Sequence, residues 1–232
     1  MSIQAATIEA REPQEIEPNR RTRPAQIWLV RHGQTDANLI GRYQGHLDLP
    51  LNETGREQVN VMGAQLREEL ATRGLSSVQA IYSSDLIRTR ETAQAAATAL
   101  EMPVIPDARL REIHMGDWEG SFFTEIREQF PDLVDRRFRD PMHIAPPNGE
   151  TTFDVAKRMW PALDEYAARH QGDDPIVVVS HGMAIATVIC RMRGMALSRV
   201  FEVVPGNAEI TVIEWEPTHP SWQEHEEALS QR

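Results

Sequence analysis

The chain is short of three things: cysteine, long apolar runs and positive charge. Cys190 is its one cysteine, which excludes an intrachain disulfide and favours a cytoplasmic protein. No apolar run approaches the roughly 20 residues that span a bilayer, and the N-terminus has no apolar core of the signal-peptide type. The net charge of −11 disfavours nucleic acids and membranes as partners. A small anionic partner fits this composition if particular arginines form a local positive site.

The motifs of several enzyme classes are missing as well. Histidine and carboxylate pairs at metal-ligand spacing, such as His-x-His or His-Glu-x-x-His, do not occur. The Gly-x-Ser-x-Gly of serine hydrolases is absent, and so are the glycine-rich loops that bind nucleotides. We therefore expect no metal and no cofactor.

Segments typical of strands and helices alternate along the chain. Apolar residues at near-helical spacing, Val59, Met62, Leu66 and Leu70, indicate a helix, and the β-branched run at 176–179 is typical of a central parallel strand. We expect strands at about 27–31, 78–82, 104–105, 176–179 and 209–215, and helices at about 53–73, 85–100, 121–139, 151–169 and 183–192. The alternation predicts an α/β sandwich with a mainly parallel sheet. The apolar stripes of the last two helices, Met159, Leu163 and Tyr166 and then Val188, Ile189 and Met192, are interpreted as core.

Two of the predicted strands end in a histidine followed by a glycine. The first leads into Arg31-His32-Gly33 and the later one into Ser180-His181-Gly182. Ligands bind at the carboxyl ends of strands in open α/β sheets, so both imidazoles are expected in one crevice. A neutral imidazole is a good nucleophile, and an adjacent guanidinium suits a phosphate.

Two further segments carry candidate groups. Arg88 follows the strand and turn at 81–85 and lies in the first turn of a predicted helix with Ser84 or Asp85 as N-cap, where the helix dipole favours an anion. Glu112 precedes a Gly-Asp-Trp-Glu-Gly turn and is a candidate proton donor and acceptor. Taken singly, a solvated helix face is an equally good interpretation of Arg88, and a solvated loop a better one of Glu112.

Several short motifs follow one another along the chain: Val30-Arg31-His32-Gly33-Gln34-Thr35, Asn38, Arg42-x-Gln44-Gly45, Ser84-Asp85-Leu86-x-Arg88-Thr89, Leu110-x-Glu112, Gly116-x-Trp118-x-Gly120, Gly149-Glu150 and Ser180-His181-Gly182. Together they resemble the histidine phosphatase superfamily, the phosphoglycerate-mutase-like branch 1. The resemblance covers about residues 27–215 and implies a three-layer αβα sandwich with a phosphate pocket at the strand carboxyl ends.

The resemblance also implies roles for single residues. His32 would take up the phosphoryl group, and Glu112 would protonate the leaving oxygen and then activate water. The groups that would bind the phosphoryl oxygens are Arg31, Arg88 and His181. The further substrate contacts would be Asn38, Arg42, Gln44, Gly45 and Gly182. The expected enzyme is a metal-independent phosphatase acting on a small anionic phosphate ester.

Two alternatives stay open: a cofactor-dependent phosphoglycerate mutase and a non-catalytic phosphate-binding module. The mutases resemble one another in a Glu-Arg-His-Tyr-Gly stretch and a long insertion after it. This chain has Glu112-Ile113-His114-Met115-Gly116 and a short segment instead, which favours a phosphatase.

For the organisation of the chain we expect a disordered arm at 1–25, one catalytic domain at 26–216 and an acidic tail at 217–232. Within the domain, the segment at about 121–147 is expected to cap the site. It offers five candidates for contact with a second anionic group of the substrate, although most of them are expected to face solvent: Arg127, Arg136, Arg137, Arg139 and His143. The sequence is compatible with a homodimer and does not determine the substrate.

Overall fold

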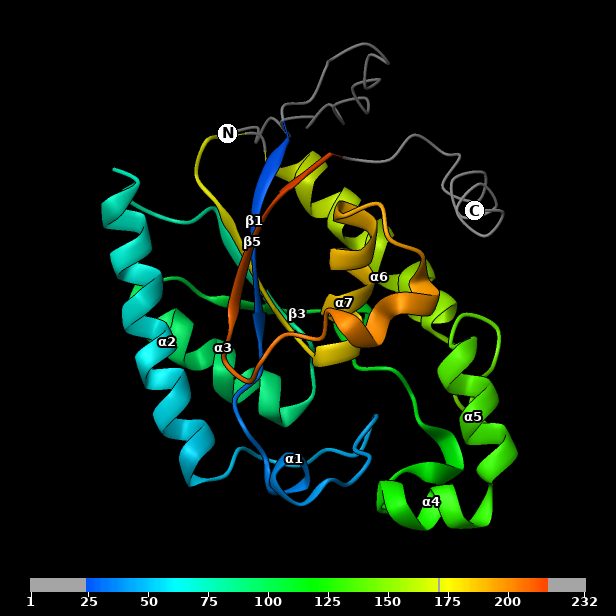
Figure 1. Cartoon of the computed structure of the whole chain (residues 1–232). Helices are drawn as coiled ribbons and strands as arrows, with labels where there is room; N and C mark the ends of the chain where they lie inside the picture. Colours follow the sequence, from blue (N-terminus) through cyan, green and yellow to red (C-terminus); the bar gives the residue numbers. More distant parts are fainter. Residues whose placement is uncertain (1–23, 171, 217–232) are drawn as a thin grey trace, which may run out of the picture.

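The computed structural model describes residues 24–170 and 172–216, and a five-stranded sheet in the order β3-β2-β4-β1-β5 lies at its centre (Figure 1). The strands are β1 (Ala25–Arg31), β2 (Ala80–Ser83), β3 (Val104–Pro106), β4 (Ile176–Ser180) and β5 (Ile210–Trp215). The first four in this list run parallel to one another, and β5 pairs antiparallel with β1. The prediction of a mainly parallel sheet is confirmed.

Helices cover both faces of the sheet. The helices α2 (Glu53–Thr72) and α3 (Ile87–Leu100) lie on one face, and α6 (Thr152–Arg169) and α7 (Gly182–Met192) on the other (Figure 1). Side chains of a strand point alternately to its two faces, so Trp28 and Val30 pack with the first pair of helices and Ile27 and Leu29 with the second. The predicted three-layer αβα sandwich is confirmed.

The remaining helices gather beyond the carboxyl ends of the parallel strands. A short helix α1 (Asp36–Ile40), which was not predicted, follows β1, and the expected cap segment forms α4 (Phe123–Gln129) and α5 (Pro131–Arg139). Three 3₁₀ turns complete the structure: η1 (Ala108–Leu110), η2 (Gly116–Trp118) and η3 (Leu197–Glu202). The elements that are not part of the sandwich therefore lie where the candidate site residues were expected.

Several predicted boundaries are wrong. The helix expected from Asp85 begins at Ile87 with Leu86 as its N-cap. The reason is that Ser84 and Asp85 have other partners: the Ser84 hydroxyl bonds the His181 ring, and the Asp85 carboxylate accepts two hydrogen bonds from Arg111. The strand expected from residue 78 begins at Ala80. In α7, Val188 and Ile189 are buried as predicted, but Met192 at its end is 40% exposed.

Two predicted segments lie outside the described residues. They are the tail at 217–232 and the arm at 1–25, of which the structure describes Pro24 and Ala25, the first residue of β1. Within residues 24–170 and 172–216, no helix is long and apolar enough to cross a membrane.

Candidate active site

The two strand-end histidines lie side by side. β1 and β4 are paired in parallel with Arg31 opposite Ser180, so the next residues, His32 and His181, leave the sheet together. Their ring centroids are 5.2 Å apart and the rings meet edge to face at 64°. Both side chains are buried, with 2% and 0% of the residue exposed. The expectation that both imidazoles share one crevice agrees with this geometry.

The His32 ring is neutral, and one of its nitrogens keeps a free lone pair. Its Nδ1 lies 2.7 Å from the carbonyl oxygen of Gly33. A carbonyl oxygen only accepts, so Nδ1 carries the proton and Nε2 carries the lone pair. Burial lowers the pKa of His32 well below its usual value, and the positive charges of Arg88 and Arg31 lower it further. The ring is therefore uncharged at neutral pH, with Nε2 free of a proton as a nitrogen nucleophile must be.

The ring of His181 is fixed by a hydrogen bond of one of its nitrogens. Its Nε2 and the hydroxyl of Ser84 are 2.9 Å apart, while its buried Nδ1 has no hydrogen-bond partner. Burial lowers the pKa of His181 well below its usual value, and the charge of Arg88 acts in the same direction. His181 is also the N-cap of α7, so the helix begins directly behind the two rings.

Arg88 is completely buried, and no acidic side chain of residues 24–170 and 172–216 forms an ion pair with it. Its two terminal nitrogens donate to the backbone carbonyls of Leu47 (2.8 Å) and Gly45 (2.7 Å), and its Nε has no partner. Burial lowers the pKa of Arg88 to about 10, so the guanidinium keeps its charge at neutral pH. This fixed cation lies close enough to His32 and His181 to depress the pKa of both.

Arg31 has a similar environment. It donates to the carbonyl of Pro205 at 2.6 Å, and its Nε is buried without a partner. Burial lowers the pKa of Arg31, against the opposing charges of Glu112 and Glu209. Unpartnered buried donors are costly, and among the described residues Arg31 and Arg88 each have one, at Nε. An anion with several oxygens would supply the missing acceptors.

The Glu112 carboxylate is anchored at the start of α7. It accepts hydrogen bonds from the backbone N–H groups of Ile113 (2.9 Å), Met183 (3.2 Å) and Ala184 (3.2 Å). The last two belong to the first turn of α7, where the helix dipole favours a negative group. The helix that begins after His181 therefore also orients Glu112.

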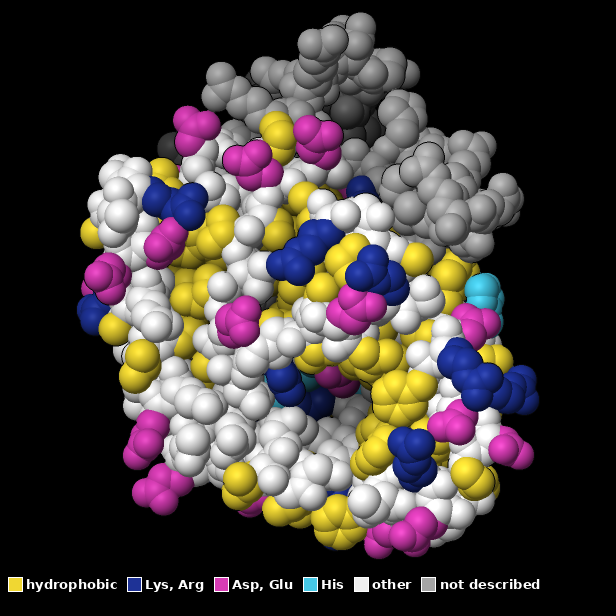
Figure 2. Space-filling model, in the orientation of Figure 1, with side chains coloured by type: hydrophobic (Ala, Val, Ile, Leu, Met, Phe, Trp, Pro, Cys, Tyr) yellow, Lys and Arg dark blue, Asp and Glu magenta, His cyan; other side chains and the backbone are white. Residues whose placement is uncertain are grey.

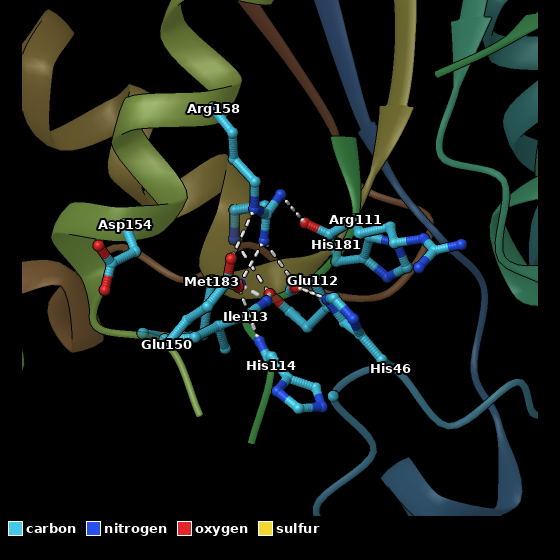
Figure 3. Close-up of polar contacts among 12 residues, drawn as sticks. His46, Arg111, Glu112, Ile113, His114, Glu150, Asp154, Arg158, His181 and Met183 are labelled. Atoms are coloured by element: carbon cyan, nitrogen blue, oxygen red, sulfur yellow. Dashed lines mark hydrogen bonds and ion pairs between the residues drawn. The ribbon is translucent and has the colours of Figure 1, made fainter. Parts of the chain in front are cut away.

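Arg158 of α6 fixes the loop that carries Glu112 (Figure 3). Its guanidinium donates to the backbone carbonyls of Arg109 (2.9 Å), Arg111 (2.6 Å) and Glu112 (2.8 Å). Two further hydrogen bonds, 3.0 and 2.9 Å long, go to the carboxylate of Glu150. These five bonds use every N–H of the guanidinium, so the backbone around Glu112 is tied to α6.

Asn38 and Gln44 are joined through Thr35. Thr35 is the N-cap of α1, and Asn38 completes a reciprocal capping box with it. The Thr35 hydroxyl donates to the side-chain oxygen of Gln44 at 2.8 Å. The segment after His32 is thereby folded back so that both side chains reach the same pocket.

Gly45 stands where the backbone passes another loop. Its φ is +50°, and a Cβ there would lie 2.0 Å from Oε1 of Glu119. A side chain at this position would displace the carbonyl that Arg88 contacts. Arg42, by contrast, is exposed and lies 4.4 Å from the ring centroid of Phe122.

A pocket of about 200 Å³ joins most of the predicted site residues, and Figure 2 shows its mouth as a hollow with basic, histidine and acidic side chains at its base. Eight of the ten line it: Arg31, His32, Asn38, Arg42, Gln44, Gly45, Arg88 and Glu112. His181 and Gly182 lie behind this lining. His181 contacts the His32 ring, and a Cβ on Gly182 would lie 3.3 Å from the guanidinium of Arg31.

The rest of the pocket lining is mostly apolar, and of its residues only Arg137 of α5 was a candidate from the sequence. These further lining residues are Tyr43, Ile113, Met115, Trp118, Val134, Arg137, Phe138, Met183 and Phe201. Of the five cap residues named as candidates for a second anionic group, Arg137 alone lines the pocket. The sequence signal was the cluster of arginines, and only the fold distinguishes the inward one. In the part of the chain that the structure describes, no group of three or more histidine, cysteine or acidic side chains could hold a metal ion.

The comparisons with known proteins agree with this architecture. The family profile "Histidine phosphatase superfamily (branch 1)" matches residues 27–228. Phosphoserine phosphatase 1 of Hydrogenobacter thermophilus is 34% identical over 81% of this chain and 85% of that protein. Glucosyl-3-phosphoglycerate phosphatase of Mycolicibacterium vanbaalenii is 36% identical over 75% of this chain and 76% of that one. A solved mycobacterial glucosyl-3-phosphoglycerate phosphatase, in complex with VO3, has a TM-score of 0.72 and 32% identity over 81% and 90% of the two chains.

The fold and the site define an α/β enzyme of phosphate-ester chemistry. The chain belongs to the histidine phosphatase superfamily, branch 1. The prediction of a phosphoric monoester hydrolase of this family is confirmed. The individual roles of the site residues, the substrate and the oligomeric state stay predictions.

Proposed function

We propose that the protein hydrolyses a small phosphate monoester through a phosphohistidine at His32, without a metal ion. The observation that carries this proposal is the state of His32. It is buried and neutral, its Nδ1 is engaged by Gly33, and its remaining nitrogen belongs to a pocket that also contains two arginines without acidic partners in the described part of the chain.

In the first step, Nε2 of His32 attacks phosphorus and the ester P–O bond breaks. The electron pair of that bond goes to the leaving oxygen, which takes a proton from Glu112. Arg31 and Arg88 bind the phosphoryl oxygens and stabilise the charge of the transition state, because they are fixed beforehand and need little reorganisation. The unpaired Nε donors on both arginines support this assignment.

In the second step, water attacks the phosphohistidine and the N–P bond breaks. Glu112, now a carboxylate, takes a proton from the water, and the N–P electron pair returns to Nε2. Inorganic phosphate leaves and His32 is neutral again. Glu112 is suited to serve both steps because three backbone N–H groups hold its carboxylate in one place.

Trapping the intermediate tests the proposal. Enzyme is mixed with a ³²P-labelled monoester, quenched in alkali and mapped by peptide, because a phosphoramidate survives alkali and is lost in acid. Label is expected on His32, absent in His32→Asn and retained in His143→Asn, which alters an exposed histidine outside the pocket lining. Label on another residue, or full turnover by His32→Asn, would contradict the mechanism.

A further inference from the structure

The pocket contains a second buried cation, on its cap side. Among the described arginines, only Arg88 and Arg137 are less than 9% exposed, at 0% and 5%. Burying a charged group is costly unless it is paired. Arg88 belongs to the phosphoryl end of the site, so its burial has a function there. Arg137 lies on α5 and takes no part in the steps proposed above.

The contacts of Arg137 leave its charge uncompensated. Its Nη1 donates to the backbone carbonyl of Ile144 at 2.9 Å, and its Nη2 lies 3.7 Å from the sulfur of Met115. A thioether is a weak acceptor, and no carboxylate of the described residues forms an ion pair with Arg137. Apart from these two contacts, the described residues offer no hydrogen-bond acceptor to the guanidinium of Arg137.

The surroundings of Arg137 offer another donor in a water-poor setting. Trp118, which lines the same pocket, is 1% exposed and has a buried indole N–H without a partner. Val134 and Phe138 from the same helix add apolar surface to the lining, and Figure 2 shows hydrophobic side chains along this side of the hollow. A low-dielectric wall strengthens the attraction between a guanidinium and an anion.

The Tyr43 hydroxyl also experiences this charge. Burial raises the pKa of Tyr43, and the positive charge of Arg137 opposes that rise. The charge of Arg137 therefore acts on a residue of the pocket lining.

We propose that Arg137, assisted by the indole N–H of Trp118, binds a carboxylate on the alcohol part of the substrate. The preferred substrate is then a small phosphorylated hydroxy acid, with its phosphate at Arg31 and Arg88 and its carboxylate at the cap. The assignment rests on the proposed phosphatase function of the same site.

Two observations favour one carboxylate over a second phosphate. Arg137 is the one buried cation on the cap side of the pocket lining, so it balances a single negative charge, and its planar fork matches a carboxylate. The pocket volume of about 200 Å³ is below the range of roughly 300–1,000 Å³ typical of drug-sized ligands, which favours a short alcohol.

A matched pair of substrates tests the proposal in the unmodified enzyme. 3-Phosphoglycerate and glycerol 3-phosphate differ at one end, where a carboxylate replaces a hydroxymethyl group. We expect kcat/KM to be about 10- to 100-fold higher for the acid, the value of a charge-assisted hydrogen bond. p-Nitrophenyl phosphate, which has no carboxylate, measures the phosphatase chemistry by itself.

Variants then assign the preference to Arg137. Arg137→Met should remove the preference, mainly through KM for the acid, and change kcat/KM for the two esters without a carboxylate by less than about threefold. Trp118→Phe should reduce the preference by a smaller factor. Arg136→Met, which removes an exposed charge from the same helix, should behave like the wild type.

The outcomes separate the two proposals. Hydrolysis of all three esters without preference for the acid would overturn the carboxylate site and leave the phosphatase function intact. An equal loss on all three in Arg137→Met would show that Arg137 only holds the Ile144 carbonyl, and would also overturn it. If Arg137→Met does not fold, the test uses Arg137→Lys, together with the comparison of 3-phosphoglycerate and glycerol 3-phosphate in the wild-type enzyme. Failure to hydrolyse any of the three would overturn the phosphatase function and the carboxylate site with it.

Discussion

The guanidinium of Arg158 donates a hydrogen bond of 2.8 Å to the backbone carbonyl of Glu112, 46 positions earlier in the chain. Because the same guanidinium also binds the carbonyls of Arg109 and Arg111, it holds the whole approach to Glu112. The side chain of Glu112 is fixed separately by α7. Two helices on one face of the sheet thus determine where the proposed acid and base lies.

The first prediction concerns the hydrogen bonds of Arg158. Arg158→Lys keeps the charge but loses the planar fork, so it cannot bind three carbonyls and Glu150 at once. Displacing a catalytic group by about 1 Å can cost around 100-fold in rate, and we expect kcat to fall by about that factor with little change in KM. Steady-state kinetics measure it, with Arg169→Lys on the same helix as the control. A loss confined to KM would contradict a positioning role.

The second prediction concerns Glu112 itself. Glu112→Gln keeps the shape but can no longer donate and then accept a proton. General acid–base catalysis is typically worth about 100- to 10,000-fold, so kcat on alkyl phosphates should fall by that order. The loss should be smaller for p-nitrophenyl phosphate, because its leaving group needs less protonation. An equal loss on both substrates would mean that Glu112 acts elsewhere.

How far the sequence predicts this site depends on the kind of residue. His32 and His181 could be placed because each follows a short apolar strand, and parallel strands end at the same edge of a sheet. Glu112 was predicted through family resemblance, since a loop carboxylate has no local signal of its own. The resemblance likewise implied Arg88, whereas the helix N-cap was misplaced because Ser84 and Asp85 bond distant partners.

The cap side shows why the rest was not predictable. Arg137 and its neighbours Arg136 and Arg139 look alike in sequence, and only the packing of α5 turns one of them inward. The sequence likewise gives no signal for the role of Arg158, because three of its five hydrogen bonds go to backbone carbonyls 46 to 49 positions away. Long-range contacts of this kind follow from tertiary structure and leave no periodicity behind.

The third prediction is a loss of stability in mild acid. His32 and His181 are buried with pKa values well below the usual 6.5, so they stay neutral in the folded state. The unfolded chain takes up these protons as the pH falls through about 6.5, which favours unfolding. Between pH 7.5 and 5.5, each of the two should lower the free energy of unfolding by up to about 1.4 kcal/mol.

Urea unfolding at both pH values measures this effect. His181→Asn should show a smaller difference between pH 7.5 and 5.5 than the wild type, whatever its absolute stability. Arg136→Met, which changes an exposed side chain of the cap and no imidazole, should keep the wild-type difference. A wild-type stability that is flat over this range would contradict burial of neutral imidazoles.

The fourth prediction is independence from metal ions. Arginines occupy the positions where a cation would otherwise stabilise the phosphoryl charge, so exhaustive treatment with EDTA should leave kcat nearly unchanged. Vanadate, a mimic of the five-coordinate phosphoryl group, should inhibit competitively. Loss of activity in EDTA that zinc or magnesium restores would overturn the prediction.

The last prediction is that hydrolysis outruns phosphoryl transfer between bound molecules. A mutase must shield its phosphohistidine from water and return the phosphoryl group to the bound product. The cap of this chain consists of the two short helices α4 and α5, and the pocket beneath it opens to the surface (Figure 2). Water should therefore reach His32.

With 3-phosphoglycerate as substrate, we expect steady release of inorganic phosphate and little 2-phosphoglycerate, whether or not 2,3-bisphosphoglycerate is added. Both products are assayed in one reaction. Isomerisation that depends on the bisphosphate and exceeds phosphate release would identify a mutase instead.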